Sequence, residues 1–172
     1  MKRFVLALFA MLMMVAVYAD NPIEITLGSK GFLKDYASAN VEIDFSKTIY
    51  KEKELLMESL TEEEFERYTS KAIGAFAEAF NHNSKRLKID NSEDARYAID
   101  IEVDKIDYFF SVMSLVPGHK HTFFGTITVT NLDTAEIVCE MIVTRLKGGR
   151  DFSLEDSFYK CFAELGKELA KL

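Results

Sequence analysis

Three carboxylates that alternate along one stretch are the first candidates for chemistry in this sequence. Asp100, Glu102 and Asp104 could form a cation site or an acid pair. Their alternation is typical of a strand, where successive residues on one face lie about 6–7 Å apart, too far to wrap a single ion. We therefore interpret them as a solvated face that protects a sheet edge.

A His-x-His pair is the second candidate. His119 and His121 flank Lys120, and two such imidazoles can ligate zinc or copper. The lysine places a positive charge between them, and no nearby Cys, Asp or Glu completes a ligand set. We expect no metal site here and interpret the histidines as polar loop residues at the start of a strand.

The two cysteines are the remaining reactive side chains. Cys139 falls in an alternating apolar pattern and Cys161 in the apolar stripe of the last predicted helix, so both should point into the core. In an oxidising compartment they would either form a disulfide worth about 3 kcal/mol or remain two buried thiols that act as small hydrophobic side chains. A redox role is not expected without a Cys-x-x-Cys pair.

The usual local signatures of catalysis are absent from the sequence. There is no Gly-x-Ser-x-Gly elbow, and neither cysteine lies beside a histidine. Gly148-Gly149 is not followed by the Lys-Ser/Thr of a phosphate-binding loop. The lack of tryptophan also disfavours a sugar-processing site. We therefore expect that the protein is not an enzyme and that it needs no cofactor or metal.

An unusually apolar connection is the main candidate for an interaction site. Residues 109–124 join two predicted strands and read FFSVMSLVPGHKHTFF, although loops normally face water. Two interpretations stay open: an exposed patch that receives a partner protein or a lipid, or a long hairpin that folds over the helices and buries these residues. The residues of the predicted interaction patch are Phe109, Val112, Met113, Leu115, Val116 and Phe124.

Two amphipathic helices are predicted to position these residues. Thr61 should cap the first, Glu64 should complete a capping box, and apolar residues recur at helical spacing to about Asn81. Ser153, with Asp156 nearby, should cap a terminal helix. A further short helix is expected over residues 51–60.

Alternating patterns predict the strands. Short strands are expected over 23–27, 41–45 and 87–89, and longer ones over 97–113, 122–130 and 137–143. The alternation changes phase at Asp104-Lys105, which predicts a bulge or a strong bend. The order of elements predicts an α+β two-layer sandwich: a mostly antiparallel meander sheet with two main helices on one face. The other face, rich in threonine and carboxylates, should meet solvent or a partner.

The first nineteen residues have the form of a cleaved export signal. A basic start precedes the apolar run 4–17, and small residues precede the expected cut after Ala19. The run of fourteen residues is shorter than the roughly 20 that span a bilayer. We expect residues 20–172 to be one α+β domain, periplasmic or extracellular, soluble after signal cleavage and without a transmembrane segment.

The charge balance limits the partners. Removing Lys2 and Arg3 with the signal takes the formal net charge from −7 to −9. Nucleic acids and anionic membrane surfaces select for Lys and Arg, so neither is expected to bind.

Several short motifs carry a resemblance. They are VEIDFS at 41–46, VDKID at 103–107, GTITV at 125–129, LDTAEIVC at 132–139 and ELGKELA at 164–170. With these motifs the chain resembles a family of small exported proteins from Bacteroidetes that have no assigned activity. More distantly, the segments 94–97 (DARY) and 133–136 (DTAE) resemble the strand start and turn of envelope α/β modules of the TolB amino-terminal and penicillin-binding-protein activator type. That resemblance implies protein–protein contact in the cell envelope without catalysis.

The sequence supports two main hypotheses on function. The first is a non-enzymatic envelope protein that binds another envelope protein through the open sheet face or the 109–124 hairpin. The second is a binder of a small apolar ligand or lipid in a cavity between sheet and helices. Its lining would be Phe76, Phe80, Tyr108, Phe158 and Phe162. A hydrolase would require His119 or His121 beside a carboxylate in a pocket.

Overall fold

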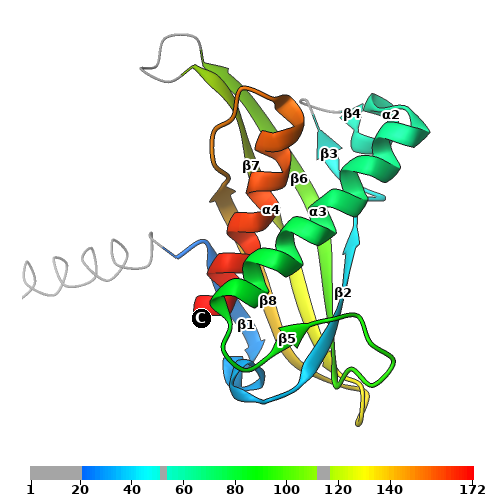
Figure 1. Ribbon diagram of the computed structural model, residues 1–172, viewed down its shortest axis with the longest axis vertical. Coiled ribbons are helices and arrows are strands. Elements are labelled where there is room, and N and C mark those ends of the chain that lie inside the picture. The colour runs from blue at the N-terminus through cyan, green and yellow to red at the C-terminus, as the bar shows by residue number, and fades with distance from the viewer. Residues whose placement is uncertain (1–20, 51–53, 112–116) are drawn as a thin grey trace, which may run out of the picture.

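The computed structural model describes residues 21–50, 54–111 and 117–172. It consists of a mixed sheet with two long helices on one face (Figure 1). The strands are β1 (Ile23–Gly28), β2 (Ser38–Asp44), β3 (Ile49–Tyr50), β4 (Glu54–Leu55), β5 (Lys88–Ile89), β6 (Tyr97–Ser111), β7 (Gly118–Asn131) and β8 (Glu136–Lys147). The helices are the 3-10 helix η2 (Lys30–Lys34), α2 (Leu56–Ser59), α3 (Glu62–Asn83) and α4 (Leu154–Lys171). The predicted export signal lies outside the described residues.

The strand order combines a local meander with distant pairings. β6, β7 and β8 form the predicted antiparallel meander, and β1 pairs antiparallel with β8 at one side. On the other side β2 runs parallel to β6, and β5 runs parallel to β2. The predicted α+β sandwich is therefore confirmed, but its sheet is mixed rather than purely antiparallel.

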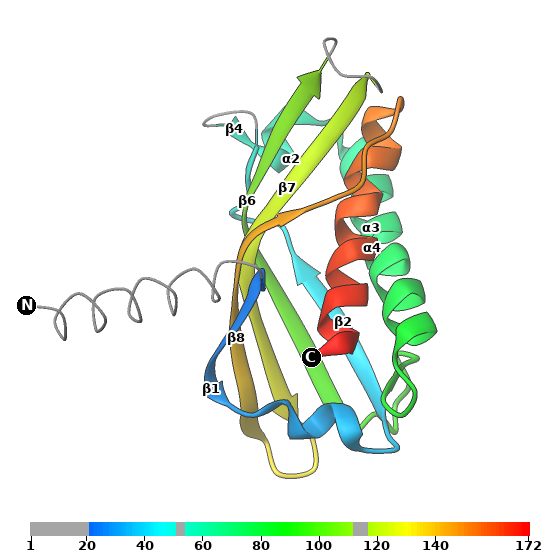
Figure 2. The same ribbon diagram turned by 90° about the vertical axis from the view of Figure 1, so that its left-hand side faces the viewer.

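Both long helices lie on the same side of the sheet (Figure 2). The predicted capping box is present at the start of α3, where Thr61 Oγ1 accepts from the Glu64 N–H and the Glu64 side chain accepts from the Thr61 N–H. The two helices approach closely at Gly166, where an added Cβ would lie 2.3 Å from the Phe76 carbonyl oxygen. Their apolar faces and the inner face of the sheet form one hydrophobic core. Within the part of the chain described, no helix is both long and apolar enough to cross a membrane.

The predicted phase change in β6 is confirmed. The register between β6 and β7 shifts between Val103 and Lys105, as a bulge requires. Before the shift Val103 faces the core, and after it Ile106 does. As a result, Phe110 lies on the helix side of the part of the β6–β7 hairpin beyond the bulge, and Phe109 lies on the opposite side.

Several predicted boundaries were wrong, including those of the 51–60 helix and of β7. Residues 51–60 do not form one helix, because Glu54 and Leu55 pair with β3 and only Leu56–Ser59 are helical. Strand β7 starts at Gly118 rather than Thr122, because the long β6 continues past its bulge and offers a partner as far as Ser111. The histidines are therefore strand residues, not loop residues.

The cysteines are both buried and free. Cys161 Sγ lies 3.8 Å from the carbonyl oxygen of Leu146. Cys139 precedes Leu146 by seven residues in β8, which at the rise of a strand is roughly 20 Å. A disulfide needs Cα atoms within about 7 Å. Of the two states expected from the sequence, the structure has the two buried thiols and no bridge.

Candidate functional site

The two histidines of β7 point toward the helices and contact hydroxyl groups. His119 Nδ1 lies 2.8 Å from the Tyr108 hydroxyl. His121 has no exposed surface; its Nε2 lies 3.3 Å from the Tyr50 hydroxyl and its Nδ1 2.9 Å from Ser157 Oγ. Across the described ranges, no group of three or more His, Cys, Asp or Glu side chains could hold a metal ion. The His-x-His pair therefore connects β3, β6, β7 and α4 in the packing of the core.

The contact between Ser157 and His121 is the arrangement that most resembles a nucleophile with its base. Ser157 Oγ also lies 2.8 Å from the Leu154 carbonyl oxygen, which can only accept. Because a hydroxyl has one proton, Ser157 donates to Leu154 and accepts from His121 Nδ1. A nucleophilic serine must instead give its proton to the histidine. Both side chains are also fully buried, out of reach of a substrate in solvent.

Strands β6 and β7 meet the start of α4 at one end of the molecule (Figure 1), and three exposed phenylalanines belong to these segments. Phe109 is 62 % exposed, Phe110 46 % and Phe152 75 %. The Phe110 ring lies against His119, with ring centroids 4.8 Å apart. The backbone of His119 pairs with that of Asp151, which brings the loop of Phe152 against β7. We call Phe109, Phe110 and Phe152 the aromatic end.

The aromatic end overlaps in part with the predicted interaction patch. Phe109 and Phe124 lie on the same outer face of the hairpin, and Phe124 is half-buried with Lys105 Nζ 5.7 Å from its ring centroid. The other four residues of the predicted patch, Val112, Met113, Leu115 and Val116, lie outside the described residues. The exposure of Phe109 favours the interpretation of an accessible patch at this position.

Sequence reasoning missed Phe152, although a signal was present. Phe152 immediately precedes Ser153, the N-cap of α4. An apolar residue at this position usually packs against the fourth helical residue. In α4 that residue is Ser157, which is polar and hydrogen-bonded to His121. Phe152 therefore has no staple partner and faces solvent.

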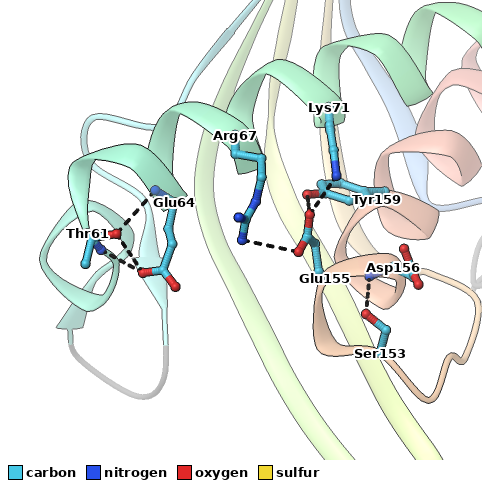
Figure 3. A network of polar contacts seen from close by, with 8 residues as sticks. All are labelled: Thr61, Glu64, Arg67, Lys71, Ser153, Glu155, Asp156 and Tyr159. Atoms are coloured by element: carbon cyan, nitrogen blue, oxygen red, sulfur yellow. Dashed lines mark hydrogen bonds and ion pairs between the residues drawn. The ribbon is translucent and has the colours of Figure 1, made fainter.

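A network of polar contacts fixes the first turn of α4, and with it the loop of Phe152 (Figure 3). Glu155 accepts from the Tyr159 hydroxyl at 2.5 Å and from Lys71 Nζ at 2.9 Å, and its other oxygen lies 3.3 Å from Arg67. The hydrogen bonds from Tyr159 and Lys71 lower the pKa of Glu155 below its ordinary value. Burial and the neighbouring Glu155 raise the pKa of Tyr159. This network joins the middle of α3 to the start of α4.

Basic residues lie next to the aromatic end, in a chain whose net charge is negative. Partial burial and the nearby charges of Lys147 and Arg150 lower the pKa of Lys120. Lys120 itself is the cross-strand partner of Phe109. This end of the molecule therefore combines apolar rings with positive charge.

The outer face of the sheet has the opposite sign. Glu42 lies opposite Asp100 and Asp44 opposite Glu102 in the parallel pairing of β2 with β6. Burial and then the charge of Glu42 raise the pKa of Asp100. A shallow hollow of about 310 Å³ lies over these carboxylates. The face is polar and solvent-exposed, as the sequence predicted. It does not protect a sheet edge, because β6 lies between β7 and β2 inside the sheet.

The residues expected to line a ligand cavity pack against one another instead. Phe76, Phe80, Phe158 and Phe162 have no exposed surface. The ring centroids of Phe158 and Phe162 are 5.2 Å apart, and those of Phe76 and Phe80 are 6.2 Å apart. These four rings belong to the core between sheet and helices, and Tyr108 is half-buried beside His119.

No family model matches the sequence, and no curated protein matches it. Among solved structures, the chain is similar to the PelC dodecamer from Paraburkholderia phytofirmans, at 15 % identity and a TM-score of 0.49, covering 85 % of this chain and 96 % of that one. It is also similar to a neuraminyllactose-binding hemagglutinin homolog from Helicobacter pylori, at 7 % identity and a TM-score of 0.41, covering 80 % and 83 %. A DUF330 protein from Xanthomonas campestris follows at 11 % identity and a TM-score of 0.41, covering 83 % and 86 %. None of these three is a TolB-type module, and the resemblance drawn from the sequence motifs stays a prediction.

Proposed function

We propose that the protein is an exported, non-enzymatic protein that acts in the cell envelope by binding another protein through its aromatic end. The observation that carries this proposal is the exposure of three phenylalanines at one end, at 62, 46 and 75 %. Exposed aromatic rings are typical of interaction sites, because their burial on binding contributes much of the binding free energy. Phe109 and Phe110 face opposite sides of the β6–β7 hairpin, so the proposed partner contacts this end from both sides.

The surroundings of the aromatic end support a protein partner. Its rings are held by regular structure, Phe109 and Phe110 by β6 and Phe152 by the fixed start of α4. A pre-positioned surface loses little conformational entropy on binding. The nearby Lys120 and Arg150 favour a partner surface that is acidic around an apolar centre.

The non-enzymatic part of the proposal is supported by the buried Ser157–His121 contact. Its hydrogen bonds run in the wrong direction for a nucleophile, and neither side chain reaches the surface. The second hypothesis, a small apolar ligand between sheet and helices, is disfavoured because the rings that would line its cavity fill the core.

A capture experiment with matched variants tests the proposal. The mature protein, the triple variant F109S/F110S/F152S and the control Y36S are immobilised and exposed to a detergent extract of the native cell envelope. Tyr36 is 83 % exposed and lies outside the aromatic end, so Y36S removes one exposed ring elsewhere. Circular dichroism confirms that all three proteins are folded.

We expect one protein to be enriched at least tenfold on the wild type and on Y36S over the triple variant. Equal capture by all three proteins would contradict the proposal. Binding of the wild type to protein-free lipid vesicles, lost in the triple variant, would assign the aromatic end to a lipid surface instead.

A further inference from the structure

The outer edge of β2 is open over part of its length. β5 covers this edge only at Ser38 and Ala39, and beyond it the Val41 N–H donates to Asn91 Oδ1 at 2.7 Å. Alternate residues of a strand direct their backbone groups to the same side, so Ile43 is the next residue to face this edge. Within the described ranges, no strand pairs with Ile43 on this side; its register partner, Ile101, lies in β6 on the other side of β2.

The two faces beside this edge differ in chemistry. A cleft of about 350 Å³ lies along this edge between β2 and the helices α2 and α3; Met57, Phe65 and Ile73 line its helix side, and Glu42 and Asp44 also border it. Met57 is 48 % exposed there. On the outer side, Glu42 and Asp44 are exposed and share the hollow that Asp100 and Glu102 line. The edge therefore has apolar side chains of α2 and α3 on its helix side and carboxylates on its outer side.

We propose that the open edge of β2 binds an extended segment of a partner protein in which apolar and basic residues alternate. The segment adds a strand to the sheet and pairs with the backbone of Ile43, while its side chains alternate between the two faces. Its apolar residues enter the cleft beside Met57, and its Lys or Arg residues lie against Glu42 and Asp44.

Charge complementarity selects this occupant over a second copy of the chain. Pairing of two copies edge to edge would place Glu42 and Asp44 of one beside the same carboxylates of the other. Like charges on neighbouring strands are destabilising, and the sheet already has Glu42 opposite Asp100. A basic segment relieves this repulsion.

The inference goes beyond the proposed function and rests on different residues, so each can fail alone. The probe is a seven-residue peptide that alternates lysine with valine, with acetylated and amidated ends. One control peptide alternates glutamate with valine; another has the lysines and valines in two blocks, so that its valines cannot share one face. Binding to the mature protein is measured by isothermal titration calorimetry, and amide hydrogen exchange is followed by NMR.

We expect the alternating lysine peptide to bind at least tenfold more tightly than either control and to slow exchange of the Ile43 amide at least tenfold. The Glu42 amide, which faces β6, should change little. E42K and M57D should each weaken binding at least fivefold, whereas E136K, the same charge change on β8, and the F109S/F110S/F152S variant should not. Glu42, Met57 and Glu136 are all exposed, so these variants should fold.

Three outcomes would overturn the inference. The first is binding of the lysine peptide that leaves Ile43 exchange unchanged. The second is equal binding of all three peptides. The third is protection of the Ile43 amide in the free protein that rises with protein concentration, which would assign the edge to a second copy.

Discussion

The close contact between α3 and α4 predicts opposite effects for the same substitution at two glycines. Gly74 is an exposed residue of α3, and an added Cβ would meet no atom within 4 Å. Gly166 is a buried residue of α4, and an added Cβ would lie 2.3 Å from the Phe76 carbonyl oxygen and 3.1 Å from the Phe80 nitrogen. G74A should therefore stabilise the protein and G166A should destabilise it.

The magnitudes follow from helix propensity and packing. Alanine is better than glycine inside a helix by about 1 kcal/mol, and both variants gain this amount. At Gly166 the methyl group needs a carbon–oxygen distance of about 3.3 Å, so the helices must separate by about 1 Å. Such overpacking costs roughly 1–3 kcal/mol, with the upper end expected against rigid backbone. We expect G74A to raise the free energy of unfolding by about 1 kcal/mol and G166A to lower it by about 2 kcal/mol.

Urea unfolding of the mature protein, followed by circular dichroism, measures the difference. In thermal melts, 1 kcal/mol corresponds to about 2–4 °C for a chain of this size, so the two variants should differ by about 6–12 °C. If G166A proved as stable as G74A, the close approach of the two helices would be refuted.

The remaining predictions concern the polar groups. E155Q should lower the free energy of unfolding at pH 7 by about 1 kcal/mol. Since the folded pKa of Glu155 lies below its ordinary value, the difference in stability between E155Q and the wild type should vanish as pH falls through that folded value. Urea unfolding at pH 7 and pH 3 measures it. D100N should raise the free energy of unfolding at pH 7 by about 0.5 kcal/mol because it removes repulsion from Glu42. Since the folded pKa of Asp100 is raised, the gain in stability should shrink as acid protonates Asp100 in the wild type. A gain that persisted at pH 3 would contradict charge repulsion as its cause. S157A should cost about 1–3 kcal/mol by leaving His121 Nδ1 without this partner, and retention of its binding in the capture experiment would separate stability from function. Burial raises the pKa values of both thiols, that of Cys161 to about 12, so neither should react with a thiol reagent in the native protein and both should react in denaturant; a disulfide in the intact mass would contradict the structure.

Local signals in the sequence account for the features that were predicted correctly. The caps at Thr61 and Ser153 depend on residues three positions away, and the bulge in β6 is visible as a change of phase at Asp104-Lys105. The meander needs only short connections between neighbouring strands. Each of these features is encoded within a few consecutive residues.

The features that were missed depend on partners distant in sequence. No local pattern shows that β2 pairs with β6 rather than with a nearer segment, because α3 and β5 lie between them in the chain. His121 appears polar in the sequence, and it lies in the core in contact with the hydroxyl groups of Tyr50 and Ser157, which are distant in sequence. The edge of β2 is open because β5 pairs with only two of its residues. The pattern at 87–89 predicted a short strand but not its pairing with β2.

Site-specific photo-cross-linking tests the central claim, that the aromatic end binds a protein. Phe109 is replaced by benzoylphenylalanine in the protein expressed in its own cells, and Tyr36, an 83 % exposed ring elsewhere, is replaced in a parallel strain as the control. After irradiation, the adducts are separated on gels and identified by mass spectrometry. The proposal predicts a discrete adduct with one protein at position 109 that is absent at position 36. Adducts with lipid alone at position 109, or the same set of adducts at both positions, would contradict it.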